Sequence, residues 1–131
     1  MSYAVGSDLP GFRIASVDPA AMVVWAGLLH DPNPIHLDVA AVQAAGLGDR
    51  RINQGPANLA YIINMLHAAF PGARLTGIDV RYMANVLEED AVVAGGTVTD
   101  VADGRVDCDV WLEVEGRGKA LAGTATMTMA G

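Results

Sequence analysis

Residues 55–72 read GPANLAYIINMLHAAFPG, and this stretch carries the longest helical pattern of the chain. A Gly-Pro pair suits the start of a helix, because proline is tolerated in the first turn, and the Pro-Gly pair after Phe70 suits its end. The polar residues recur every three positions, at Asn58, Tyr61, Asn64 and His67. At about 3.6 residues per turn, that series winds around the axis and leaves no clean solvent face. The pattern therefore predicts a long, largely enclosed helix.

Four strand-like stretches follow this helix, at residues 75–83, 91–101, 105–114 and 119–129. Asp103-Gly104 and the EGRG sequence at 115–118 are turn signals between them. A further short strand is expected at 12–17. Because no crossover helices separate the last strands, this order predicts an α+β domain, with an antiparallel sheet of four or five strands wrapped around one long central helix, and excludes a doubly wound parallel sheet.

Two more helices are expected before the central one. Asp18 and Pro19 suit an N-cap and a first helical residue, and they open a helix over 19–29 that is apolar nearly all round, so we expect it to be buried. Prolines at 32 and 34 end it. Asp38 is a second N-cap candidate, for a short helix that ends near Gly46.

Composition limits the possible functions. The 131 residues suit one domain, 1–131, and a net charge of −7 argues against nucleic-acid or anionic-membrane binding, which need a dense basic surface. The mean hydropathy of +0.31 indicates a generous core or apolar surface that another subunit covers. The longest apolar run, 20–29, has ten residues, whereas a membrane span needs about 20. With no signal-peptide pattern and a single cysteine, Cys108, we expect a cytoplasmic protein.

The densest polar cluster is DPNPIHLD at residues 31–38. In a helix Asp31 and His36 would lie about 140° apart around the axis, but the two prolines prevent a helix and favour a loop. A loop can bring carboxylate and imidazole together, and such a pair can hold a water molecule and move its protons. From the residues alone, both a catalytic pair and an ordinary turn before a helix remain open.

This motif resembles the D-x-N-P-I-H-x-D sequence of the MaoC-like, (R)-specific enoyl-CoA hydratases, which have the hotdog fold, and the resemblance extends over almost the whole chain. It implies a single hotdog domain that adds water to trans-2-enoyl thioesters, or removes it from (R)-3-hydroxyacyl thioesters. His36 would take a proton from water, and Asp31 would hold that water and help deliver a proton to Cα. Asn33 would brace the loop beside the substrate.

The same resemblance places an oxyanion donor at Gly55, where a helix N-terminus stabilises negative charge on the thioester oxygen. A plain N-cap glycine is the alternative. The family's usual His-Gly pair reads Gln54-Gly55 here, followed by Pro56, which has no N–H. Gln54 is expected to contact substrate but cannot act as a base. A serine that the family tends to carry on the central helix is absent, and Tyr61 or Asn64 is the candidate to replace it.

The substrate is expected to be an acyl-CoA or an acyl-carrier thioester. Arg50 and Arg51 are candidates to meet the nucleotide phosphates, and Arg74 and Arg81 are further candidates. Coenzyme A would enter only as part of the substrate, so no cofactor is expected. His30 and His67 have no carboxylate or cysteine at metal-ligand spacing, so no metal site is predicted.

Two other functions stay open on the sequence. A hotdog thioesterase is opposed by the lack of any carboxylate between residues 56 and 70, where many such enzymes carry one. A low-activity partner subunit of a hetero-oligomeric hydratase is suggested by the departures at Gln54 and Pro56, and opposed by the intact motif. An unpaired sheet edge needs cover, so a homodimer or a higher homo-oligomer is expected.

Overall fold

A computed structural model describes residues 3–129 of the chain, and all of its strands belong to one sheet. The elements follow in the order β1 (Phe12–Ile14), α1 (Pro19–Leu29), a short 3-10 helix (Pro34–His36), α2 (Val39–Ala44), α3 (Gly55–Ala69), β2 (Arg74–Tyr82), β3 (Val92–Ala102), β4 (Arg105–Val114) and β5 (Gly118–Thr128). The four long strands lie within one residue of their predicted bounds. Only β1 is markedly shorter than expected.

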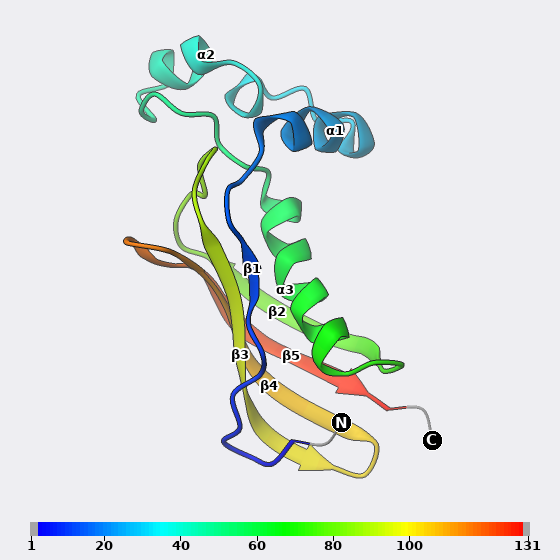
Figure 1. The fold of residues 1–131 in the computed structure, drawn as a ribbon. Helices are drawn as coiled ribbons and strands as arrows, with labels where there is room; N and C mark the ends of the chain where they lie inside the picture. Colours follow the sequence, from blue (N-terminus) through cyan, green and yellow to red (C-terminus); the bar gives the residue numbers. More distant parts are fainter. Residues whose placement is uncertain (1–2, 130–131) are drawn as a thin grey trace.

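The five strands form an antiparallel sheet in the order β1-β3-β4-β5-β2. The sheet curves along α3, which lies across one of its faces, while α1 and α2 lie beyond one end of the sheet (Figure 1). This arrangement is the α+β hotdog architecture expected from the sequence. β2 is an edge strand, so one side of its backbone has no strand partner within residues 3–129.

The core fills the space between α3 and the sheet. The helix contributes the fully buried side chains Ile62, Met65 and Leu66, and the strands contribute alternate residues such as Leu112 and Met127. Each such side chain stabilises the fold by about 1.5–3 kcal/mol. The core therefore holds α3 against the sheet.

The expectation of a buried α1 is wrong for this chain. Only Met22 of the helix is buried, and Val23, Val24 and Leu28 are each at least 60% exposed. The reason is geometric: α3 already covers the sheet, and α1 lies beyond the sheet's end (Figure 1). Hydropathy shows that a helix is apolar but does not show what packs against it.

The central helix is also less enclosed than predicted. One side of α3 packs against the sheet, but Asn64 and His67 are exposed to solvent.

Within residues 3–129, none of the helices has the length and apolar character that a bilayer crossing requires.

Candidate active site

The motif loop is held in shape by its own side chains. His30 ends α1 in the left-handed conformation, at φ 50°, and turns the chain into the loop. Asp31 Oδ1 accepts a hydrogen bond from Asn33 N at 3.1 Å, and Asn33 Oδ1 accepts one from Ile35 N at 3.3 Å. Asn33 thus braces the loop. Asp38 Oδ1 accepts from Ala40 N at 2.9 Å, which confirms it as the N-cap of α2.

Asp31 and His36 lie together, as the motif predicts. Asp31 Oδ2 is 3.4 Å from His36 Nε2, and the histidine is 8% exposed. His36 Nδ1 lies 2.6 Å from the carbonyl oxygen of Ile52, and a carbonyl can only accept, so Nδ1 carries a proton. In the neutral ring the free lone pair is therefore on Nε2, facing Asp31. Two acceptors side by side suit a water molecule that donates one hydrogen to each.

The pair separates two hollows. His36 lines a pocket of about 390 Å³, together with Gly55, Asn58 and residues that follow β2. Asp31 lines a different hollow, together with His30 and residues at the end of α1. A reacting molecule in the 390 Å³ pocket, which we call the active-site pocket, would meet the histidine first.

Gly55 opens α3 at the border of this pocket. Its N–H has no hydrogen-bond acceptor within residues 3–129. Tyr82, the last residue of β2, donates from its hydroxyl to the Gly55 carbonyl at 3.1 Å. A β-carbon on Gly55 would come within 3.3 Å of the Tyr82 ring, so glycine permits this close packing. Burial raises the pKa of the Tyr82 hydroxyl, which keeps it a donor.

Gln54 points away from the active-site pocket. Its side chain is fully buried and donates from Nε2 to the Met22 carbonyl at 2.8 Å, so it ties α1 to the start of α3. Contact of Gln54 with substrate stays a prediction, and the structure gives the residue a structural role as well.

A buried amide network was missed by the sequence reasoning. Asn53 Nδ2 donates to Asn58 Oδ1 at 2.8 Å and to the Tyr61 hydroxyl at 3.2 Å, and both asparagines line the active-site pocket. Burial raises the pKa of Tyr61, and its hydrogen bond with Asn53 partly opposes that rise. Tyr61 therefore joins the network next to the site. Asn64, the other candidate to replace a serine, is exposed.

Arg50 and Arg51 already have carboxylate partners. Arg50 contacts Asp90 at 3.2 Å and also donates to the Glu88 carbonyl, and Arg51 pairs with Glu88. Arg117 also reaches Asp90, at 2.6 Å. Their predicted contact with substrate phosphates is not excluded by this pairing, but much of their charge is neutralised inside the protein.

These ion pairs hold the segment that orients His36. Asn53 N donates to the Val86 carbonyl, and Glu88 N donates to the Arg51 carbonyl, both at 2.8 Å. Ile52, between them, provides the carbonyl that binds His36 Nδ1. The cluster around Asp90 therefore helps to hold His36 in its orientation from outside the pocket.

Asp90→Asn is expected to lower the free energy of unfolding by about 2 kcal/mol at pH 7. The Asp90 side chain is 5% exposed. Burial opposes its ionisation, but hydrogen bonds from Arg117 and Leu87 N and the charges of Arg117 and Arg50 outweigh burial and hold its pKa below the usual range of an aspartate. The extra stability of the wild type over Asp90→Asn should therefore be complete above the pKa of an unfolded aspartate, about 3.9, and should be lost as the pH falls through the lowered pKa. Urea denaturation at several pH values measures it.

Asp100→Asn is the matched control for this variant. Asp100 also pairs with an arginine, Arg105, but its side chain is 59% exposed, so its loss should cost less than about 0.5 kcal/mol. An equal effect of the two substitutions would show that burial of Asp90 is not what matters.

No three His, Cys, Asp or Glu side chains group as a metal site would require within the described residues. His30 and His67 are both exposed.

The fold and the family are shown by comparison with known proteins. The family model described as "MaoC like domain" matches residues 7–115. Among solved structures, the (R)-hydratase from A. caviae involved in PHA biosynthesis superposes with a TM-score of 0.89, at 22% identity and with 98% of each chain covered. A chain of the ChsH1-ChsH2 complex from Mycobacterium tuberculosis gives a TM-score of 0.87, at 22% identity, over 98% of this chain and 100% of that one.

A more distant match is a mutant of the fluoroacetyl-CoA-specific thioesterase FlK, with a TM-score of 0.71, 15% identity, and 98% and 88% of the two chains covered. The curated protein sequences include no match to this chain. The family match spans the motif loop, α3 and most of the sheet, and the chain belongs to the MaoC-like domain family.

Proposed function

We propose that the protein catalyses the (R)-specific hydration of trans-2-enoyl thioesters, or the reverse dehydration of (R)-3-hydroxyacyl thioesters. The observation that carries the proposal is the geometry of His36. Its Nδ1 is committed to the Ile52 carbonyl, so Nε2 is left as a base that faces Asp31 beside the active-site pocket. Membership of the MaoC-like family supports the same reaction class.

The proposed step begins with water held between Asp31 Oδ2 and His36 Nε2. Nε2 takes one proton, and the oxygen adds to the β-carbon of the enoyl group. Negative charge then moves to the thioester oxygen, for which the unoccupied N–H of Gly55 is the donor. Return of a proton from the Asp31/His36 pair to the α-carbon completes the addition of one water. No group outside the protein and the two reactants is needed for this balance.

Incubation of the purified protein with crotonyl-CoA and longer enoyl-CoAs tests the proposal. Hydration removes the conjugated double bond, so the ultraviolet absorbance of the enoyl thioester should fall, and chiral analysis should return the (R)-3-hydroxyacyl product. A panel from short linear to bulky ring-bearing acyl groups defines the substrate range. Unchanged absorbance with every member of the panel would contradict the assignment.

Thioester hydrolysis is the second candidate, because a thioesterase is among the structural matches. It is opposed by α3, which carries no carboxylate from Gly55 to Ala69. Release of free thiol from saturated acyl-CoA would favour it. Cys108 should not disturb this assay, because burial, helped by the charges of Asp107 and Asp109, raises its pKa to about 11.

We also propose that the protein works as a homodimer or a higher homo-oligomer. The apolar surface of α1 and the unpaired edge of β2 support this. A hetero-oligomer with a related chain is the alternative, since one structural match is to a chain of a two-protein complex. Light scattering of the purified chain that gave the mass of one 13.6 kDa chain at micromolar concentration would contradict the homo-oligomer and leave the hetero-oligomer.

A further inference from the structure

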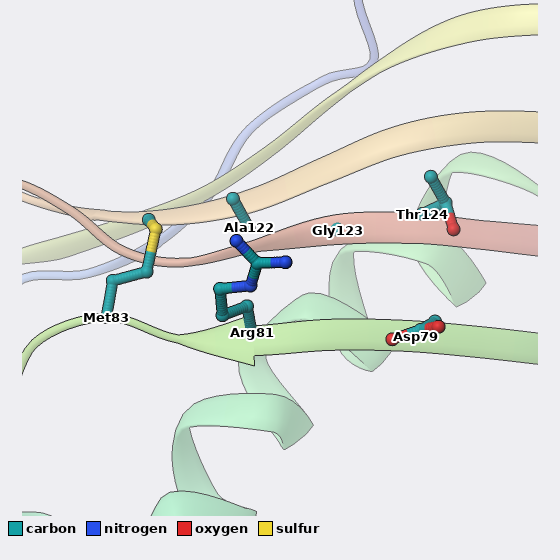
Figure 2. Close-up of a pocket in the computed structure, with 6 residues that line it drawn as sticks. All are labelled: Asp79, Arg81, Met83, Ala122, Gly123 and Thr124. Carbon is teal, nitrogen blue, oxygen red and sulfur yellow. The ribbon is translucent and has the colours of Figure 1, made fainter.

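A second hollow, of about 380 Å³, lies on the face of the sheet turned away from α3 (Figure 2). Ile78 and Val80 pack toward the core, so the alternate residues of β2 project from the opposite face. We call this hollow the outer groove. Its lining comes from β2 with the residue after it, and from β5: Asp79, Arg81, Met83, Ala122, Gly123 and Thr124.

The outer groove meets the active-site pocket at Met83, which lines both. From Met83 the groove follows β2 back to Asp79, four residues away, or about 13 Å at the rise of a strand. A molecule whose reactive group lies beside His36 would therefore have to pass Met83 to reach the outer face of the sheet.

Arg81 gives the groove an unpaired cation. Five of the seven arginines form ion pairs with carboxylates, whereas Arg81 and Arg74 form none within residues 3–129. The side chain of Arg81 lies over the groove in Figure 2, with Ala122 beside it. A guanidinium without a carboxylate is ready to bind phosphate or carbonyl oxygens.

The rest of the lining suits a thin, polar chain. Ala122 and Gly123 add almost no side-chain bulk, so the floor remains open. Asp79 and Thr124, which face each other in the β2–β5 register, offer oxygens that accept hydrogen bonds from N–H and O–H groups. The groove thus combines one cation, two acceptors and a floor free of bulky side chains.

We infer that the outer groove binds the phosphopantetheine arm of the thioester substrate, with Arg81 contacting its phosphate. The inference rests on the proposed function. A phosphopantetheine arm has amide and hydroxyl groups along its length and a phosphate at its end, and both coenzyme A and acyl-carrier proteins present one. This assigns the phosphate contact to Arg81, whereas Arg50 and Arg51 are paired within the protein.

Arg81→Gln is expected to raise KM for crotonyl-CoA about 10-fold with little change in kcat, because a charge-assisted hydrogen bond outside the reacting centre is lost. The N-acetylcysteamine thioester of the same acyl group lacks the phosphate and most of the arm, so its kcat/KM should stay within about 2-fold. Arg74→Gln alters the other arginine of β2 that forms no ion pair within residues 3–129, so it is the matched control. It should leave KM and kcat unchanged with both thioesters. Ala122→Leu, which fills the groove, should act like Arg81→Gln.

Two substrates distinguish the possible sources of the arm: crotonyl-CoA and a crotonyl group on an acyl-carrier protein. If Arg81→Gln lowers kcat/KM with both substrates, the groove recognises the arm that they share. If the variant lowers kcat/KM with the coenzyme A thioester alone, the groove binds the arm of coenzyme A. An equal loss on the N-acetylcysteamine thioester, or no loss on crotonyl-CoA, would overturn the inference while leaving hydration established.

Calorimetric titration with free coenzyme A keeps this test independent of hydration. If the wild-type protein hydrated no thioester, the proposed function would fail. A Kd that Arg81→Gln weakens about 10-fold would still support the groove, and an unchanged Kd, or no binding by the wild type, would overturn it.

Discussion

His36→Gln is expected to lower kcat for enoyl-thioester hydration by about 1,000-fold, within the range that general acid–base catalysis supplies. Glutamine can still donate to the Ile52 carbonyl but has no basic nitrogen in place of Nε2. The variant should therefore keep its fold and lose the base. Absorbance of the conjugated enoyl thioester measures the rate, and urea denaturation checks stability.

Asp31→Asn is expected to cause a loss of similar size, because the amide cannot share a proton with the histidine 3.4 Å away. The two residues act as a unit, so the double variant should lose little more than either single one. His67→Ala is the matched control, since this histidine is exposed on α3 and lies outside the motif loop. A rate in His36→Gln within about 3-fold of the wild type would remove His36 from the mechanism.

How much of this site could be predicted from the sequence depends on how far apart its partners lie along the chain. Asp31 and His36 are five residues apart in a loop stiffened by prolines, and the motif is sufficient to predict their contact. Arg50 and Asp90 are 40 residues apart, on segments that only the folded sheet brings together. A local pattern therefore cannot predict that Arg50 and Arg51 pair with carboxylates, and it leaves both as candidates for the substrate phosphates.

The fold shows a similar division. β4 and the second half of β5 alternate apolar and polar residues, and turn sequences join β3, β4 and β5, so the positions of these strands follow from the chain itself. The exposure of α1 does not, because packing depends on which element covers the sheet first. α3 takes that place, and α1 is left beyond its end (Figure 1).

The polar residues of α3 recur every three positions, as the sequence shows, but this spacing does not make the helix enclosed. A step of three residues drifts about 60° around the axis, so the series of four cannot keep to one face. In the structure its first half, Asn58 and Tyr61, joins Asn53 beside the active-site pocket. Its second half, Asn64 and His67, turns to solvent. The drift therefore does not enclose the helix: it divides a side that faces the pocket from a side that faces solvent.

Gly123→Ala is expected to lower the free energy of unfolding by at least about 3 kcal/mol, a large effect for overpacking. A β-carbon at this position would lie 1.9 Å from the Asp79 carbonyl oxygen and 2.7 Å from Val80 Cα. Both are backbone atoms of the neighbouring strand, so no side chain can move aside. β2 would have to separate from β5, where Val80 and Gly123 are paired in register.

Gly77→Ala provides the comparison, because it lies on the same pair of strands. A β-carbon there would meet nothing closer than Thr126 Cβ at 3.8 Å, an ordinary contact, so its cost should stay within about 1 kcal/mol. Thermal unfolding should show a midpoint about 10 °C lower for Gly123→Ala and nearly unchanged for Gly77→Ala. Because β2 and β5 also form the outer groove, Gly123→Ala should weaken coenzyme A binding while the protein is still folded. Equal unfolding midpoints for Gly123→Ala and Gly77→Ala would show that β2 and β5 do not approach so closely at Gly123. The groove that these strands form would then lose its structural basis.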